Sequence, residues 1–420
     1  MKMLARLPGS QAHADADVVL DVFQQRTGPM TLGWGGHRLL ATLRQHGVLT
    51  TPRSLDLLSI ALAVNLADQG ASREGSPDGW TRELDLEIEV RDSAFWQSQA
   101  LSLAEMLRFL TTDHWTVTFR DSPWTPSPSP VRTPLETSAA LLSGGLDSLI
   151  GGIDLLAQGQ QPILVSSLAQ GDGLRQRRLG HALGARHIQF RHTSRWSTNA
   201  RDRSQRARSF LFFAYGVAVA TWIAQTQHRT ETTLYVCENG FISVNPALTG
   251  ARVGSLSTRT THPNYMRAFQ RLLESAELPV KLVNPYAFST KGEMVAACRD
   301  RVMLEELAPD TNSCGRYARN AYRHCGRCVP CLVRRAAFVA AAVPDPTPGY
   351  VYDDLSIEDN RHALFDDVRS VGMAFLSAEV DASWARAATT DLGLDRERYF
   401  DTVNRGMREL GQLLRGFGLL

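Results

Sequence analysis

A glycine pair between two serines, with an aspartate close by, is the stretch of this chain whose residue types point most directly to chemistry. Residues 141–150 read LLSGGLDSLI, with an apolar run on either side. Glycines let backbone N–H groups approach an oxyanion without a Cβ in the way, and a helix starting here adds unpaired donors. We therefore expect a phosphate or pyrophosphate site formed by Ser143, Gly144, Gly145, Leu146, Asp147 and Ser148.

The polar side chains of this loop narrow the chemistry. Ser143 and Ser148 can donate hydroxyl hydrogen bonds to a phosphate, whereas Asp147 repels a bare phosphate but can hold a Mg²⁺ ion that bridges to it. The loop has neither the Gly-Lys-Ser/Thr of a Walker A site nor GxGxxG spacing. The alternative without function is a tight turn whose helix is capped by Asp147.

Four of the six cysteines lie close together in the sequence, and their spacing is typical of metal ligation. Four thiolates close a tetrahedron around zinc and leave no open position for water. We expect a structural Zn²⁺ that holds residues 312–335, with the ligands Cys314, Cys325, Cys328 and Cys331. An iron–sulfur cluster and metal-free thiols are the alternatives, because Cys-x2-Cys-x2-Cys plus a distant cysteine also occurs in iron–sulfur proteins.

The elements around the loop predict an α/β fold with a doubly wound parallel sheet. Short apolar runs alternate with helical stretches, and strands buried on both faces and joined by helices form parallel sheets. Such sheets bind ligands at the carboxyl ends of their strands. The expected strands are residues 138–142, 163–168, 187–190, 233–238 and 281–285, and the main helices are 206–227 and 263–277.

A change of pattern along the chain predicts its domains. Helical periodicity over 55–67 and strict alternation over 83–90 and 115–119 suggest a separate α/β unit before a stretch with five prolines, SPWTPSPSPVRTP. After about residue 343 the pattern is mostly helical. The expected parts are an accessory α/β domain (1–122), a Pro/Ser-rich linker (123–135), the loop-bearing domain (136–342) and a helical C-terminal region (343–420).

The overall composition argues against several classes of protein. Lysine plus arginine number 45 against 43 for aspartate plus glutamate, so no global field favours DNA or acidic membranes. The longest apolar run, residues 209–223, is short for a membrane span and is expected to be a buried helix. No secretory signal is evident at the start. We expect a cytoplasmic protein with no membrane partner and no strong nucleic-acid signal.

The loop and the cysteine segment together carry a family resemblance. SGGLDS resembles the PP-loop of ATP pyrophosphatases, and its combination with CGRCVPCLVRRAAF resembles the QueC family, the 7-cyano-7-deazaguanine synthases, over roughly residues 136–340. RARSFLFF, residues 206–213, is similar to the family's P-G-R-N segment, although the Pro-Gly is absent and Ser209 replaces the asparagine. STKGEM, residues 289–294, is similar to the family's T-K-x-E.

This resemblance implies an adenine nucleotide alpha hydrolase-like fold and an ATP-dependent ligase that forms AMP and pyrophosphate. ATP would adenylate the carboxylate of 7-carboxy-7-deazaguanine, ammonia would give the amide, and a second adenylation would allow dehydration to the nitrile. Arg208 would contact phosphate, and Lys291 would neutralise developing charge. The alternative for Lys291 is a plain first-turn lysine, because Thr290 and Glu293 form a capping-box pattern.

The segment CENGF, residues 237–241, ends an expected strand where the pocket should open. Glu238 is expected to read the guanine-like edge of the substrate, and Phe241 to stack on its ring, with Asn239 between them. The alternative is an ordinary turn at the end of a strand, since Asn-Gly pairs are common there.

The additional domains resemble the QueC-like proteins of bacterial antiphage defence operons, the QatC type. That resemblance implies that the activated carboxylate is transferred to an amine of a partner protein encoded in the same operon, with the N-terminal domain as the docking surface. A 7-cyano-7-deazaguanine synthase of queuosine-type biosynthesis and a catalytically silent zinc-stabilised scaffold are the alternatives. A tRNA-modifying enzyme would need an RNA surface, and no basic patch with interleaved aromatics is evident beyond the arginines of residues 191–208.

Overall fold

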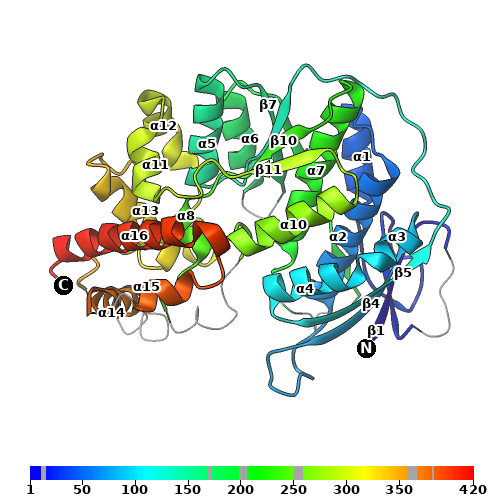
Figure 1. The fold of residues 1–420 in the computed structure, drawn as a ribbon, viewed down its shortest axis with the longest axis horizontal. Helices are drawn as coiled ribbons and strands as arrows, with labels where there is room; N and C mark the ends of the chain where they lie inside the picture. Colours follow the sequence, from blue (N-terminus) through cyan, green and yellow to red (C-terminus); the bar gives the residue numbers. More distant parts are fainter. Residues whose placement is uncertain are drawn as a thin grey trace.

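The computed structural model describes residues 1–10, 16–168, 172–197, 202, 206–249, 259–357, 367–380 and 383–420. It is an α/β structure with two sheets that lie side by side, each flanked by helices (Figure 1). A group of helices from the last third of the chain covers one end of the second sheet.

The first sheet is built almost entirely from residues before the proline-rich linker. Its strand order is β5-β4-β1-β2-β3-β9, and every pair is parallel except β3 with β9. The strands are β1 (Lys2–Arg6), β2 (Val18–Val22), β3 (Thr31–Gly35), β4 (Glu83–Val90), β5 (His114–Asp121) and β9 (Arg195–Trp196). The helices of this part are α1 (His37–His46), α2 (Pro52–Gly70), α3 (Ser93–Ser98) and α4 (Ala100–Thr111).

The second sheet is wholly parallel, with the order β11-β10-β6-β7-β8, which confirms the expected α/β class with parallel strands. Its strands are β6 (Ser138–Leu141), β7 (Pro162–Ser167), β8 (His187–Phe190), β10 (Thr232–Tyr235) and β11 (Val280–Val283). The helices around it are α5 (Leu146–Ala157), α6 (Gly173–Ala182), α7 (Arg208–Thr226), α8 (Gly240–Val244) and α10 (Pro263–Ser275). Because the strands are parallel, the loops after β6 and β10 reach the same edge of the sheet.

One helix joins the cores of the two sheets. α7 packs on α2 from one side and on β6 and β10 from the other, within a single apolar cluster that contains Leu58, Phe213 and Leu234. α7 is also the one helix of the described residues that is long and apolar enough to cross a membrane, but 78% of its most apolar window is buried inside the protein. It is therefore a core helix, as its sequence predicts.

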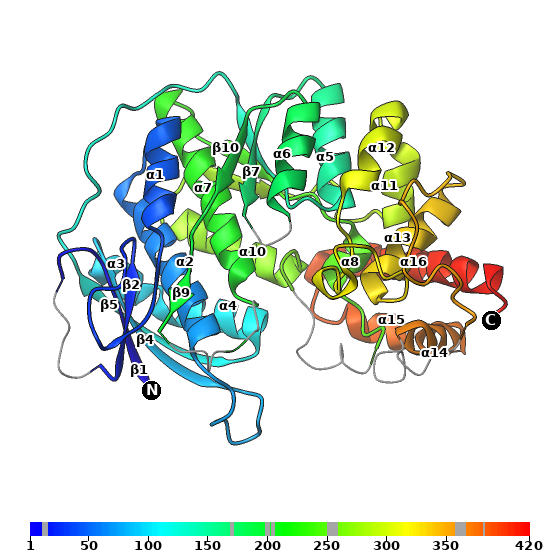
Figure 2. The same ribbon diagram turned by 180° about the vertical axis from the view of Figure 1, so that it is seen from behind.

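The proline-rich linker follows the surface from one sheet to the other and is attached on the way (Figure 2). The ring of Trp124 stacks on Phe23 at 5.5 Å. The backbone of Arg132 donates to the Gly47 carbonyl at 3.0 Å and accepts from the Trp222 indole at 2.7 Å. The linker is thus an extended segment that contacts the end of α1 and the side of α7.

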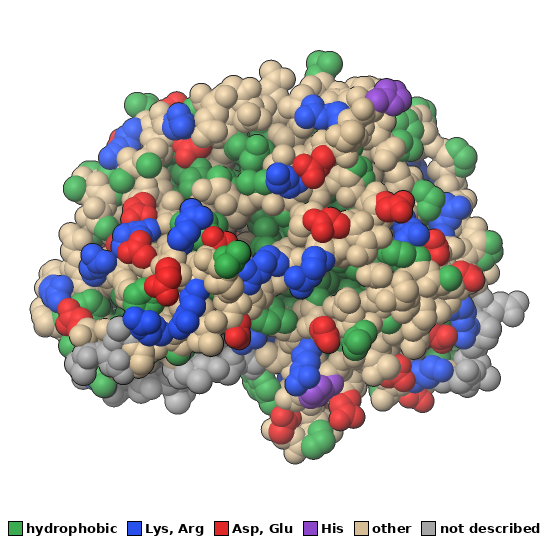
Figure 3. Space-filling model, in the orientation of Figure 1, with side chains coloured by type: hydrophobic (Ala, Val, Ile, Leu, Met, Phe, Trp, Pro, Cys, Tyr) green, Lys and Arg blue, Asp and Glu red, His purple; other side chains and the backbone are tan. Residues whose placement is uncertain are grey.

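The C-terminal part is helical in the described residues. Its helices are α11 (Lys291–Ala297), α12 (Arg301–Leu307), α13 (Val329–Ala340), α14 (Asp367–Val380), α15 (Ser383–Ala388) and α16 (Arg396–Gly416). α16 packs on α13 and α8, so this last helix lies beside the edge of the second sheet where β10 ends. On the face drawn in Figure 3, basic and acidic side chains are interspersed.

Candidate active site

The SGGLDS segment forms the turn between β6 and α5. Gly144 has a φ of 92°, a left-handed conformation that glycine adopts without strain, and Gly145 is the N-cap of α5. The Ser143 and Ser148 hydroxyl oxygens lie 3.1 Å apart, and the Ser148 hydroxyl donates to the Gly145 carbonyl at 3.0 Å. The expected strand–glycine loop–helix arrangement is therefore present, with its two hydroxyl groups adjacent.

Asp147 and Lys291 come together although they are far apart in the sequence. The Lys291 ammonium lies 2.6 Å from Asp147 Oδ1, and the Asn239 side-chain amide donates to Asp147 Oδ2 at 2.7 Å. Burial alone would raise the pKa of Asp147, but the charge of Lys291 and these hydrogen bonds lower it to about 2. Asp147 is thus a buried carboxylate that holds the lysine in place.

Lys291 also occupies the first turn of α11, behind a capping box. The Thr290 side chain accepts from the Glu293 backbone N–H, and the Glu293 carboxylate accepts from Thr290 N–H. The capping role of this motif and a buried position for Lys291 are therefore both present.

The carboxyl group of Glu238 has the opposite character to that of Asp147. Burial, the nearby Asp147 charge and a hydrogen bond to Asp147 raise the pKa of Glu238 well above its ordinary value. A neutral carboxyl group presents one donor and one acceptor. Two adjacent acids with pKa values driven apart are a common feature of sites that move or hold protons.

The two carboxylate oxygens of Asp147 are not free to coordinate a Mg²⁺ ion in this arrangement. One oxygen faces Lys291 and the other accepts from Asn239 N–H and the Asn239 amide. A metal ion on Asp147 would have to displace the lysine ammonium. The expected magnesium ligand is thus engaged within the protein.

Two adjoining cavities open at this edge of the sheet. The larger cavity, of about 560 Å³, is lined by Arg208, and the smaller cavity, of about 220 Å³, is lined by Gly145, Leu146, Asp147 and Lys291. Both are lined by Ser143, Ser148, Cys237, Glu238 and Ile242. The cavities therefore meet at the serines of the loop and at Glu238.

Arg208, the first residue of α7, lines the larger cavity together with the loop serines. Burial lowers the pKa of its guanidinium group. The structure thus places the expected phosphate-contacting arginine on the same cavity as Ser143 and Ser148.

The expected stacking residue Phe241 does not line either cavity. Its ring is 1% exposed and packs against Gly406 of α16, where a Cβ would approach it to 2.4 Å. Asn239 is fully buried as the N-cap of α8, and its side chain donates a hydrogen bond to Asp147 and does not face either cavity. Of this segment, Glu238 and Ile242 line the cavities.

Gln176 is a cavity residue that the sequence did not suggest. It is 1% exposed on α6, and its side-chain amide donates to the carbonyl oxygens of Ser143 at 3.1 Å and Ser167 at 3.2 Å. It thereby ties the loop after β6 to the end of β7. Its place within a run of arginines gives no sequence signal for this role.

The four clustered cysteines form a compact set of ligands that could hold a metal ion. Their sulfur atoms all lie within 4.8 Å of one another, and all four residues are buried. The pairs Cys314–Cys328 and Cys325–Cys331 are each separated by 3.9 Å. Zinc–sulfur bonds of about 2.3 Å place the corners of a tetrahedron roughly 3.8 Å apart, so the set fits zinc.

Backbone contacts around the cysteines also suit thiolates. N–H groups of Arg316 and Cys325 donate to Cys314 Sγ, and that of Cys328 donates to Cys325 Sγ, at 3.2 to 3.4 Å. His324 accepts from Ser313 N–H at 3.2 Å and is not part of the cluster. Outside the cluster, burial raises the pKa of the Cys237 thiol and raises that of Cys298 to about 12, so both are inert thiols.

Comparison with known proteins finds a family match for part of this region. A glycine loop after the first strand of a parallel sheet, with a four-cysteine segment beside it, is an α/β arrangement suited to a phosphorylated ligand. Residues 260–342 match the family model of the queuosine biosynthesis protein QueC. This segment contains Lys291 and the four cysteines, whereas the loop at 143–148 lies outside it.

Curated proteins give the same indication over a similar length. The chain is 39% identical over 88 residues to 7-cyano-7-deazaguanine synthases of Brucella ovis, Brucella canis and Brucella suis. The aligned region is 20% of this chain and 35% of each relative, so the chain spans about a third of the length of these relatives. The expected resemblance to the QueC family is thus supported for part of the chain.

Proposed function

We propose that this chain is an ATP-dependent carbon–nitrogen ligase of QueC-like chemistry. It adenylates a 7-carboxy-7-deazaguanine-type carboxylate, releases pyrophosphate and transfers the acyl group to an amine. One observation carries the proposal: the SGGLDS turn, Lys291, Asp147 and Glu238 converge on two cavities that meet at the loop serines. The match of residues 260–342 to QueC supports the choice of substrate class.

The residues have distinct parts in the proposed reaction. A carboxylate oxygen of the substrate attacks the α-phosphorus of ATP, and the bond to the bridging oxygen breaks, leaving pyrophosphate with the electron pair. The amides of residues 143–148, the hydroxyls of Ser143 and Ser148, and Arg208 hold the phosphates as negative charge develops. Lys291, fixed by Asp147, neutralises charge at the α-phosphate.

The second half of the proposed reaction forms the carbon–nitrogen bond. A neutral amine attacks the carbonyl carbon of the acyl adenylate, AMP leaves with the electron pair of the C–O bond, and the attacking nitrogen loses a proton to solvent. Glu238, which also hydrogen-bonds Asp147, reads the purine-like edge of the substrate by accepting hydrogen bonds from its ring N–H and exocyclic amine.

We place the amine on a partner protein encoded in the same operon, within an antiphage defence system of the QatC type in the cytoplasm. The units on both sides of the QueC-like segment support this choice, since they supply surface that the activation chemistry itself does not require. The docking surface is assigned to residues 1–122. A biosynthetic 7-cyano-7-deazaguanine synthase is the second candidate, because the partial matches have that name.

Mass spectrometry separates these functions. The purified protein is incubated with ATP, Mg²⁺, 7-carboxy-7-deazaguanine, and either ammonium or the products of the neighbouring genes. We expect AMP, pyrophosphate and a deazaguanine adduct on a partner protein. A nitrile product with ammonium would favour the synthase, and the absence of AMP under every condition would favour a silent scaffold.

A further inference from the structure

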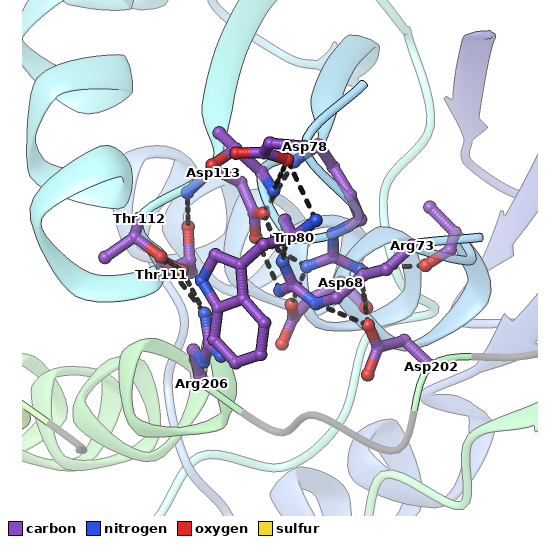
Figure 4. Close-up of polar contacts among 12 residues, drawn as sticks. Asp68, Arg73, Asp78, Trp80, Thr111, Thr112, Asp113, Asp202 and Arg206 are labelled. Carbon is purple, nitrogen blue, oxygen red and sulfur yellow. Dashed lines mark hydrogen bonds and ion pairs between the residues drawn. The ribbon is translucent and has the colours of Figure 1, made fainter. Parts of the chain in front are cut away.

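A buried cluster of ion pairs lies where the first sheet meets the start of α7 (Figure 4). The guanidinium group of Arg82 is at its centre, with Nη2 at 2.5 Å from Asp68 Oδ1 and 2.6 Å from Asp113 Oδ2. Arg73 pairs with Asp113 at 2.8 Å and with Asp202 at 2.6 Å. Asp68, Arg82 and Asp113 are all nearly inaccessible, so the charges compensate one another inside the protein.

This cluster reaches across to the residues that precede Arg208. The second oxygen of Asp68 accepts from the backbone N–H of Ala207 at 3.0 Å. The Arg206 guanidinium donates to the Thr111 carbonyl at 2.8 Å and lies 4.6 Å from the centre of the Trp80 ring. Both residues before Arg208 are therefore attached to the N-terminal part of the chain.

The contact with Asp68 engages a backbone donor at the very start of α7, the N–H of the N-cap residue. Ala207 is the N-cap of α7 and has no side chain that could accept a hydrogen bond. A carboxylate at this end of a helix also interacts favourably with the positive end of the helix dipole. Asp68, from the last turn of α2, thus accepts a hydrogen bond from the N-cap N–H of α7, which a polar side chain in place of Phe210 would accept in a capping box.

The position of Arg208 depends on this end of α7. Arg208 follows Ala207 directly and lines the larger cavity of the candidate site. It also lines a neighbouring cavity of about 800 Å³ together with Gln69, the residue after Asp68. The last turn of α2 therefore holds the start of α7 with one residue and forms part of the adjacent cavity wall with the next.

We propose that Asp68 and Arg206 are positioning residues for Arg208, so that the N-terminal part of the chain belongs to the catalytic unit. The inference rests on the proposed function in one respect, the role of Arg208 as a phosphate contact. Asp68 acts by fixing the first turn of α7, and Arg206 by fixing the backbone just before it. Neither side chain touches the substrate in this assignment.

A double-mutant cycle tests the inference on the full chain. Removal of a phosphate donor by Arg208→Ala is expected to lower kcat/KM for ATP about 100-fold, and misplacement of that donor by Asp68→Ala about tenfold. If Asp68 acts through Arg208, the double variant loses about 100-fold, as Arg208→Ala alone does. Losses that multiply to about 1000-fold would overturn the inference.

A matched control and a second variant guard against a loss that is only structural. Asp21→Ala breaks another buried pair of the same sheet, Arg6–Asp21 at 2.8 Å, which does not touch α7, and its effect should multiply with that of Arg208→Ala. Arg206→Ala leaves the Asp68–Arg82 pair intact. If Asp68→Ala fails to fold, the same double-mutant cycle is measured with Arg206→Ala and Arg208→Ala. The loss of kcat/KM caused by Arg206→Ala should likewise disappear when Arg208 is already replaced by alanine.

Amide hydrogen exchange provides a readout that does not depend on activity. Asp68→Ala and Arg206→Ala should speed exchange over residues 207–211, and Asp21→Ala should not. Unchanged exchange in this segment would overturn the inference even if activity falls. A wild-type protein that releases no pyrophosphate would instead overturn the proposed function, and the exchange result would still decide whether the cluster positions Arg208.

Discussion

At the scale of single residues, the site depends on partners that the sequence holds far apart. Lys291 and Asp147 form an ion pair at 2.6 Å, and burial together with the Asp147 charge raises the pKa of Glu238 beside them. The loop residues were predictable, because strand, glycine pair and helix start are all local patterns. The burial of Phe241 was not, because its neighbour Gly406 lies on α16 and no local pattern indicates that contact.

The first prediction concerns Lys291. Lys291→Ala should lower kcat/KM for AMP formation about 100-fold, since it removes a positive charge aimed at the α-phosphate and leaves Asp147 without its charge partner. Lys281→Ala, which changes an exposed lysine of β11, is the control and should keep wild-type activity. Equal activities for the two variants in a steady-state assay would show that Lys291 has only its first-turn role.

At the scale of elements, the cysteine segment shows how spacing predicts a site. The cysteines spaced three residues apart lie in a loop and in the first turn of α13. All four cysteine sulfur atoms lie within 4.8 Å of one another. Gly326, inside the CGRC turn, has a φ of 88°, and a Cβ there would lie 2.6 Å from the Tyr352 carbonyl oxygen. The turn therefore requires glycine at this position.

The second prediction concerns the metal. The protein should contain one zinc ion per chain, and Cys331→Ser should lose it and lower the free energy of unfolding by roughly 3 kcal/mol, because metal binding contributes directly to folding. Metal analysis by mass spectrometry and thermal unfolding give the two quantities. Cys298→Ser is the control outside the cluster. Iron with a brown absorbance in the wild type would contradict the zinc assignment.

The third prediction concerns the contact between α16 and α11. Glu409 of α16 accepts from the Thr290 hydroxyl and from the Gly292 N–H at 3.2 Å, and burial raises its pKa from 4.5 to about 7. Between these pH values the unfolded chain releases a proton that the folded protein still holds, so the folded protein loses stability as pH rises.

Glu409→Gln should remove this loss. The Tm of the variant, relative to that of the wild type, should rise as pH increases from 4.5 to 7. Glu397→Gln, at an exposed position of the same helix, is the control and should show no such trend. A difference in Tm between Glu409→Gln and the wild type that stays constant from pH 4.5 to 7 would contradict a raised pKa of Glu409 in the folded protein.

At the scale of the whole molecule, the two sheets share one apolar core. Alternation predicts β4 and β5 in the first sheet, but β1, β2 and β3 are five-residue strands without a strong pattern. β9 has two residues and comes from beyond the linker, so only the tertiary structure shows that it completes the first sheet. The same holds for the packing of α2 on α7, because α7 is buried over most of residues 210–224 and no single apolar face indicates which elements cover it.

The fourth prediction follows from this shared core. A chain that lacks residues 1–122 should be insoluble, because α7 would expose the face that packs on α2. Co-expression of residues 1–122 with the remaining chain should restore a soluble complex, since the linker between them is mainly surface-exposed. A soluble, monomeric product from the shortened chain alone would contradict the shared core.

The central claim is that the SGGLDS turn binds the phosphates that leave as pyrophosphate. A crystal structure with a non-hydrolysable ATP analogue and Mg²⁺ tests it most directly. We predict that the β- and γ-phosphates contact the backbone amides of residues 143–148, with Lys291 near the α-phosphate. Phosphates bound elsewhere, or a turn that stays closed by its own serines at saturating nucleotide, would contradict the claim.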